Sequence, residues 1–121
     1  MKALTIQEPY ASMILEGKKT IETRTWRTNY RGLVLLHASK NPKSNISGKI
    51  FAVAKIIDCK PMMKKDEKKA CCEIYPRAYS WFLQEIRPTE LKDAKGSLGL
   101  WEINAELREK LKEGELYCLF G

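Results

Sequence analysis

Two cations and one carboxylate stand close together near the amino terminus of this 121-residue chain, where Lys19, Glu22 and Arg24 follow Gly17. Lysine and arginine side chains bind phosphate or carbonyl oxygens, and a glutamate between them can accept a hydrogen bond from a base edge or activate a water. The three charges could instead neutralise one another on an exposed face, for about 0–1 kcal/mol. The spacing alone therefore indicates either a ligand-binding cleft or a solvated ion-pair cluster.

A short strand is the element that would position these charges. Residues 20–26 are rich in threonine, isoleucine and tryptophan, which favour extended backbone. Alternation along a strand places Glu22 and Arg24 on one face, and Lys19 in the preceding turn can bend toward the same side. Residues 9–16 carry apolar side chains at helical spacing and are predicted to form the helix before that turn.

The remaining pattern predicts a sheet of short strands with few helices. Residues 60–73 are predicted to be a mobile or weakly helical, solvated insertion with no catalytic role. Together these segments fit an α+β fold, a curled, mainly antiparallel sheet or small β-barrel with flanking helices. Further strands are expected over residues 2–6, 32–38, 49–58, 78–87, 98–103 and 116–120, with a last helix over 105–113.

Length and composition predict one folded domain over residues 1–121. No apolar run approaches the roughly 20 residues needed to span a bilayer, and the amino terminus lacks the apolar core of a signal peptide. We therefore expect a cytoplasmic protein with no membrane partner. Four cysteines lack both C-x-x-C spacing and histidine partners, so neither a metal nor another cofactor is expected. The oligomeric state is left open.

The net charge of +7 is unevenly distributed. Residues 1–49 hold nine lysines or arginines against three glutamates, whereas residues 50–121 hold 13 basic against 12 acidic side chains. A localised basic surface attracts phosphates by Coulomb steering and counterion release. The charge favours RNA or a nucleotide-like ligand as the partner, with plain solubility as the alternative.

Several motifs carry a family resemblance. Gly17-x-Lys19-x-x-Glu22-x-Arg24 resembles the G-x-K-x-x-E-x-R signature of the ASCH (activating signal cointegrator homology) domain of bacterial and phage proteins, a member of the PUA-like superfamily. Residues 6–11 are similar to the family's Q-P-W-A entry to the first helix, with an extra glutamate and with Tyr10 in place of tryptophan. Further similar segments are residues 26–28, 30–32, 37–39, 79–83 and 95–101.

The resemblance implies a PUA-like fold and a cleft into which the signature residues point. The family is thought to bind RNA, and some members are hydrolases that cleave RNA or remove the acyl group from N4-acetylcytidine. The resemblance thus implies RNA, nucleotide or nucleoside binding, or alternatively hydrolysis with Lys19 and Glu22 as the catalytic pair. Lys19 matches the lysine of the acyl-removing relatives, but their nucleophilic threonine matches Glu22 here.

Six further residues are candidates for the same cleft: Tyr10, Trp26, Arg27, Arg31, His37 and Ser39. Either aromatic ring could form a stacking wall for a base, and the two arginines could clamp phosphates at the edge. As alternatives, the aromatic rings could be core and the arginines solvated loop charges. The single histidine excludes a two-histidine ribonuclease mechanism within this chain, and it could equally be a hydrogen-bonded structural residue.

Overall fold

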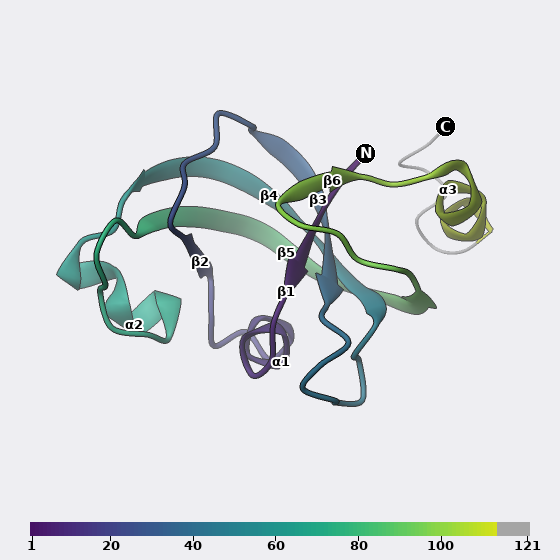
Figure 1. Ribbon diagram of the computed structural model, residues 1–121, viewed down its shortest axis with the longest axis horizontal. Helices are drawn as coiled ribbons and strands as arrows, with labels where there is room; N and C mark the ends of the chain where they lie inside the picture. The colour runs from purple at the N-terminus through teal and green to yellow at the C-terminus, as the bar shows by residue number, and fades with distance from the viewer. Residues whose placement is uncertain (114–121) are drawn as a thin grey trace.

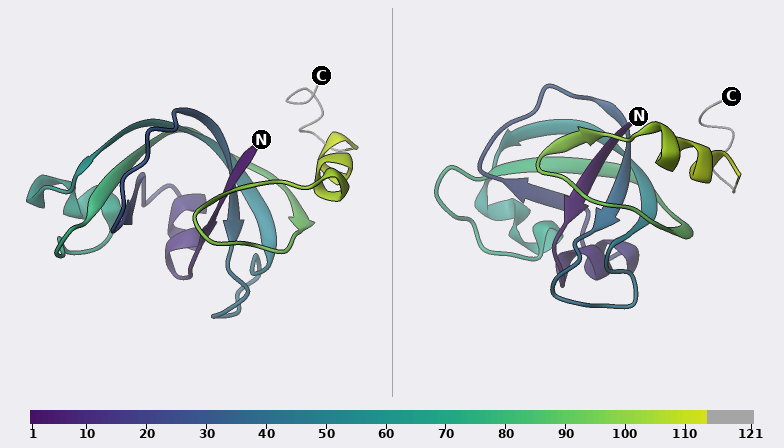
Figure 2. Two further views of the ribbon diagram at one scale, coloured as in Figure 1. Left: turned by 45° about the horizontal axis from the view of Figure 1, so that its top comes forward. Right: turned by 45° about the vertical axis from the view of Figure 1, so that its right-hand side comes forward.

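A curled sheet of six strands forms the body of the molecule in the order β2-β5-β4-β3-β1-β6. The structure, a computed structural model, describes residues 1–113. Figure 1 shows α3 and the short α2 at opposite ends of the sheet, and Figure 2 shows the sheet arching over α1. The elements are β1 (Lys2–Ile6), α1 (Tyr10–Leu15), β2 (Ile21–Arg24), β3 (Gly32–Ala38), β4 (Lys49–Pro61), η1 (Lys64–Asp66), α2 (Glu67–Ala70), β5 (Tyr79–Asp93), β6 (Leu100–Glu102) and α3 (Ala105–Lys112).

Strand pairing is antiparallel everywhere except between β1 and β3, which run parallel. Such a mixed sheet confirms the predicted α+β class with a curled, mainly antiparallel sheet. Within residues 1–113 the two end strands, β2 and β6, do not pair with each other. The sheet is therefore an open half-barrel, and the closed barrel considered as an alternative is not formed.

Two apolar clusters hold the sheet to its helices. On the concave face, Ile14 of α1 packs among Phe51 of β4 and Trp81 of β5, all at most 1% exposed. On the other face, Leu107 and Leu111 of α3 pack in a cluster with strand residues such as Leu35 and Val53. Burying a leucine or phenylalanine contributes about 1.5–3 kcal/mol, so these contacts fix both helices to the sheet.

The long β4–β5 ribbon differs from the sequence prediction. Strand β5 continues to Asp93, although Pro88 predicts an end at residue 87 because proline lacks the N–H of a ladder hydrogen bond. The register between the two strands shifts between Ile50 and Ala52, and Pro88 stands opposite Ala52 beside that irregularity. A bulge tolerates proline and bends the strands. At its other end β4 reaches Pro61 rather than residue 58, because residues 59–61 pair with residues 79–81 of β5.

The insertion after β4 is more ordered than predicted. It forms η1 and α2, and Cys71 ends α2 in the left-handed conformation with φ 57°. The Thr20 N–H donates to the Lys69 carbonyl at 2.9 Å, which ties the insertion to the chain just before β2. Most of its side chains are exposed, as expected for a solvated segment. The Thr20–Lys69 contact brings the insertion beside the signature residues.

Residues 94–99, here called the crossover segment, connect β5 to β6. Since β5 and β6 are separated in the sheet by β4, β3 and β1, the segment passes over these strands (Figure 2). At Gly96 a Cβ atom would lie 2.7 Å from both Thr5 Oγ1 and His37 Cε1. Only glycine allows the segment to lie this close to β1 and β3.

Hydrogen bonds to His37 fasten the crossover segment. An indole N–H only donates, so Trp101 Nε1 donates to Thr5 Oγ1 at 3.0 Å, and the threonine hydroxyl donates to His37 Nδ1 at 3.1 Å. His37 Nε2 then donates to the Ala94 carbonyl at 2.7 Å. This pattern requires the neutral Nε2–H tautomer, and burial lowers the pKa of His37 below its ordinary value of 6.5.

The strand predicted over residues 116–120 lies outside the described residues. Among the helices within residues 1–113, none combines the length and the apolar character needed to cross a membrane.

Candidate functional site

A pocket of about 520 Å³ opens at the signature residues and is here called the signature pocket. It lies where β1, β2 and α1 meet the insertion and the crossover segment. Its volume falls within the range of small-molecule sites, on the order of 300–1,000 Å³. The lining residues are Thr5, Gln7, Tyr10, Lys19, Glu22, Thr23, Arg24, Ser39, Cys72, Tyr75, Ser97, Leu98 and Gly99.

Lys19 is buried at the base of this pocket, with 1% of its side chain exposed. Its Nζ donates to the Ala70 carbonyl at 2.5 Å and lies 3.4 Å from Glu22 Oε1. The Tyr10 ring covers the ammonium group, with its centroid 4.9 Å from Nζ. A buried ammonium needs such partners because removal from water costs several kcal/mol. Three partners therefore hold Lys19 in one position.

Glu22 joins Lys19 to Arg24, as strand alternation predicts. Arg24 donates to Glu22 Oε2 from Nε at 3.2 Å and from Nη2 at 2.9 Å, and Nη2 also donates to the Thr5 carbonyl at 2.8 Å. A guanidinium has five N–H donors. Within residues 1–113 the two N–H groups on Nη1 have no hydrogen-bond partner, so Arg24 can still donate to an acceptor in the pocket.

The charges in the pocket do not cancel. Lys19 and Arg24 contribute two positive charges and Glu22 one negative charge, so one positive charge is left for a ligand. Glu22 is 6% exposed and makes ion pairs on both of its oxygens. A carboxylate offers about four acceptor positions, of which Arg24 occupies two, while Lys19 lies 3.4 Å from the other oxygen. The site can therefore present a guanidinium donor beside a carboxylate acceptor.

Five of the predicted site residues meet in this pocket: Tyr10, Lys19, Glu22, Arg24 and Ser39. They come from α1, the turn before β2, β2 itself and the end of β3. The structure thus brings together residues that span 29 positions of the sequence. Their roles toward a ligand stay predictions.

Four predicted site residues do not line the signature pocket. Trp26 is 39% exposed, stacks edge-on against Trp81, and reaches to within 3.7 Å of a Cβ built at Gly99, so it stands at the rim. Arg27 is exposed, while Arg31 lies 3.7 Å from Asp58 and donates to backbone carbonyls. The buried His37 faces a neighbouring cavity and fastens the crossover segment.

Sequence reasoning missed two contributions to the pocket. The insertion supplies Cys72, the chain directly after it supplies Tyr75, and the Thr23 hydroxyl lies 3.8 Å from Cys72 Sγ. The crossover segment supplies Ser97, Leu98 and Gly99. Neither segment carries a periodic or local pattern that would have placed it at the site, since tertiary contacts alone bring both there. Within residues 1–113 no cluster of three or more His, Cys, Asp or Glu side chains could hold a metal ion.

Comparison with known proteins gives one family and one fold. The family model described as ASCH domain matches residues 4–94. A crystal structure of ASCH from Zymomonas mobilis has a TM-score of 0.70 at 14% identity and covers 93% of each chain. Crystal structures of two point variants of that protein have TM-scores of 0.66 and 0.65 at 12% and 14% identity, covering 93% of this chain and 96% and 94% of theirs. No curated protein matches the sequence.

Proposed function

The chain belongs to the ASCH domain family, and from this membership and the charges of the signature pocket we propose that the protein binds one nucleoside unit of RNA, or a nucleotide, in that pocket. The main support for the proposal is the ion-paired Lys19–Glu22–Arg24 array. Within residues 1–113 its Arg24 Nη1 group has no hydrogen-bond partner and can donate to a ligand. The array would recognise the edge of a nucleobase by hydrogen bonds.

Complementarity of donors and acceptors supports a base edge. The Nη1 group of Arg24 would donate to a ring carbonyl oxygen, and Glu22 would accept from an adjacent ring N–H or amino group. The residual positive charge favours a ligand that carries a phosphate. The Tyr10 ring, half-buried over Lys19, and the half-buried Tyr75 supply aromatic surface beside the base.

Binding is favoured over turnover by the way the charged groups are occupied. A general base must reach and take a substrate proton. Glu22 already accepts from Arg24 twice and faces Lys19, and Lys19 is held by the Ala70 carbonyl. Both groups would have to leave partners before they could act as an acid/base pair. The ion-paired Glu22 is therefore assigned a ligand-reading role.

The test compares Glu22→Gln with the unmodified protein. Calorimetry and thermal shift would be recorded with the four ribonucleosides, their monophosphates and an eight-nucleotide single-stranded RNA. Ligand binding raises the melting temperature by mass action, so a bound ligand is detected by both measurements. We expect Glu22→Gln to change which base is preferred, because the amide replaces an acceptor by a donor.

Glu16→Gln is the matched control, because Glu16 is exposed and lies outside the pocket, and its one ion pair among residues 1–113 is with Lys18 at 3.6 Å. It should leave the base preference unchanged. The hydrolase alternative predicts a different outcome: the unmodified protein would deacylate N4-acetylcytidine or cleave RNA, and Glu22→Gln would abolish turnover while retaining affinity. That result would overturn the binding proposal.

A further inference from the structure

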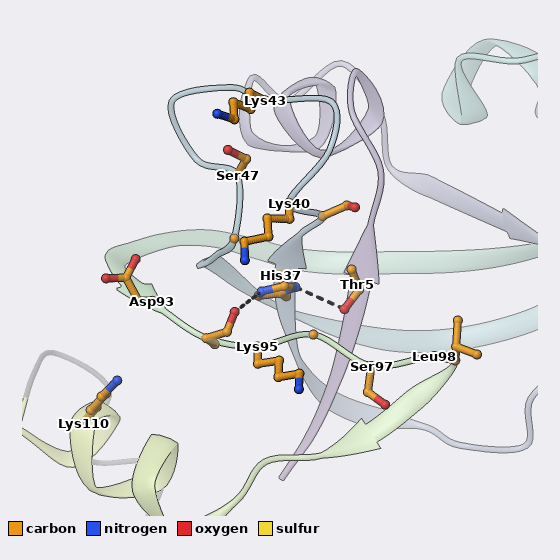
Figure 3. A pocket seen from close by; sticks show the side chains of 14 residues that line it. Thr5, His37, Lys40, Lys43, Ser47, Asp93, Lys95, Ser97, Leu98 and Lys110 are labelled. Atoms are coloured by element: carbon orange, nitrogen blue, oxygen red, sulfur yellow. Dashed lines mark hydrogen bonds between the residues drawn. The ribbon is translucent and has the colours of Figure 1, made fainter.

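A second and larger cavity, of about 1,100 Å³, adjoins the signature pocket and is here called the lysine pocket. The two cavities have Thr5, Ser39, Ser97 and Leu98 in common. Figure 3 shows the lysine pocket from close by, with His37 at its back. The two pockets are therefore neighbours that share part of their lining.

Four lysines from three separate segments border the lysine pocket. Lys40 and Lys43 come from the loop between β3 and β4, Lys95 from the crossover segment, and Lys110 from α3. In Figure 3, Lys40 and Lys95 lie on either side of His37, with Lys43 and Lys110 farther out. Segments distant in the sequence thus place like charges around one opening, which costs Coulomb repulsion in the absence of an anion.

These lysine charges are largely unbalanced. The one acidic lining residue, Asp93, is already bound to Lys49 at 2.5 Å. Within residues 1–113, Lys40, Lys43 and Lys95 have no ion pair, and Lys110 lies 3.9 Å from Glu106. All four lysines are exposed, so their charges are available to a ligand.

We infer that the lysine pocket binds the phosphodiester backbone of the nucleotides next to the one held in the signature pocket, so that the ligand is a single-stranded RNA rather than a free nucleoside. This inference rests on the proposed function of the signature pocket. The volume lies at the upper end of the range of small-molecule sites, on the order of 300–1,000 Å³, and is compatible with an extended strand. Flexible lysines are point charges that position phosphates and read no sequence.

Leu98 lies where the two pockets adjoin. It lines both cavities, and 95% of the residue is exposed. An apolar side chain at this point would lie between the base in the signature pocket and the following nucleotide, as apolar wedges do at unstacked base steps. The two pockets would then divide recognition: the signature pocket reads a base and the lysine pocket holds the backbone.

Salt dependence and two double variants test the inference. Binding of an eight-nucleotide single-stranded RNA and of the preferred nucleoside would be measured by calorimetry between 0.05 and 0.3 M salt. Each phosphate neutralised on a single strand contributes about 0.7 to the slope of log K against log salt. We expect Lys40→Ala/Lys95→Ala to reduce that slope by about 1.4 and to weaken RNA binding roughly 25-fold at 0.1 M salt. Nucleoside binding should stay unchanged.

Lys64→Ala/Lys65→Ala is the matched control. It removes the same charge from two exposed lysines of η1 that line neither pocket. It should weaken RNA binding less than threefold. Lys40→Arg/Lys95→Arg keeps the charge and should retain RNA affinity within about threefold, because phosphate positioning needs charge. An equal loss in the two alanine pairs would overturn the inference, since it would reflect net charge alone.

Two further outcomes separate the inference from the proposed function. If the nucleoside binds as tightly as the RNA and both are insensitive to Lys40→Ala/Lys95→Ala, the proposed function stands and the strand path is wrong. If a nucleoside triphosphate binds as tightly as RNA with the same lysine dependence, the occupant is a free polyphosphate, and the strand path is again wrong. If neither nucleosides nor RNA bind, both proposals fail.

Discussion

The signature pocket and the lysine pocket hold similar charges in opposite ways. In the signature pocket, Lys19 and Glu22 are at most 6% exposed and are fixed by partners on three sides. In the lysine pocket, Lys40, Lys43 and Lys95 are exposed and have no ion pair among residues 1–113. The buried charges of the signature pocket are held in position before a ligand binds. Among the described residues, these three exposed lysines of the lysine pocket have no ion-pair partner to give up when an anionic ligand binds.

This difference separates two contributions to recognition. Fixed, desolvated groups discriminate between ligands, because a mismatched partner leaves a buried polar group unpaired. Exposed lysines increase the rate of association with anionic ligands, and they add affinity that decreases as the salt concentration rises. The comparison predicts that substitutions of the buried charges in the signature pocket cost stability and selectivity, while those of the exposed lysines in the lysine pocket cost affinity for polyanions alone.

The largest effect is expected from Lys19→Ala. Removing this ammonium breaks its pair with buried Glu22 and frees the Ala70 carbonyl that holds the insertion. Breaking a buried pair from one side costs about 3–5 kcal/mol. We expect a loss of about 3 kcal/mol in the free energy of unfolding, measured by urea denaturation. Lys40→Ala should stay within about 0.5 kcal/mol of the unmodified protein; equal effects of the two variants would remove the contrast between the pockets.

A smaller loss is expected from Gly96→Ala, which affects the wall common to both pockets. The added methyl would lie 2.7 Å from Thr5 Oγ1 and His37 Cε1, so the crossover segment must shift. Overpacking of this kind costs about 1–3 kcal/mol. Urea denaturation should report that loss, and affinity for both nucleoside and RNA should fall. Ser97→Ala, at the next and exposed position, should leave the free energy of unfolding unchanged. Unchanged nucleoside binding by Gly96→Ala would show that the pockets are independent.

A pH-dependent loss of stability is expected from His37. Its pKa is lowered by burial, so the unfolded chain takes up a proton more readily than the folded chain. His37 therefore contributes to the free energy of unfolding above pH 6.5, the ordinary pKa of histidine. This contribution is lost as the pH falls from 6.5 toward the lowered pKa of the folded state. Denaturant midpoints between pH 7.5 and 5.5 would measure this, because the chain has no other histidine. His37→Gln keeps a donor near Ala94 and should remove most of the pH dependence of the midpoint. If the midpoint of that variant falls with pH as much as that of the unmodified protein, a group other than His37 causes the fall.

The smallest effect on stability is expected from Leu98→Ser. Because the leucine is 95% exposed, unfolding free energy should change by less than about 0.5 kcal/mol. RNA affinity should fall about threefold to tenfold through lost apolar contact, and nucleoside affinity should change less. Fluorescence titration with the eight-nucleotide RNA would measure the difference. Leu91→Ser, at another exposed leucine outside both pockets, is the control, and an equal fall there would leave Leu98 without a special role.

Sequence periodicity was sufficient to predict the centre of the signature pocket. Alternation along β2 put Glu22 and Arg24 on one face, and their ion pair at 2.9 Å confirms it. Gly17, predicted to end the first helix, follows α1 with φ +81°. These are short-range properties, because strand geometry and a left-handed residue depend on neighbours only a few positions away.

Long-range placement could not be predicted in the same way. Tyr75 reaches the signature pocket because the insertion docks beside β2 through the Thr20–Lys69 contact. The lysine pocket gathers Lys40, Lys95 and Lys110 through the curl of the sheet and the path of the crossover segment. No local pattern encodes such convergence. Pairing with β4 likewise continues β5 past Pro88 to Asp93, although proline usually ends a strand.

The crossover segment has a consequence for the order of folding. It is held in place on one side by the β1–β6 pairing, in which Leu4 meets Leu100 across nearly the whole described chain. Contacts between residues so far apart in sequence carry a high loop-closure entropy and tend to form late. A chain emerging from the ribosome can form the pairings among strands β1, β2, β3, β4 and β5 before β6 has been synthesised. These pairings would therefore precede binding competence, which begins only when β6 docks against β1.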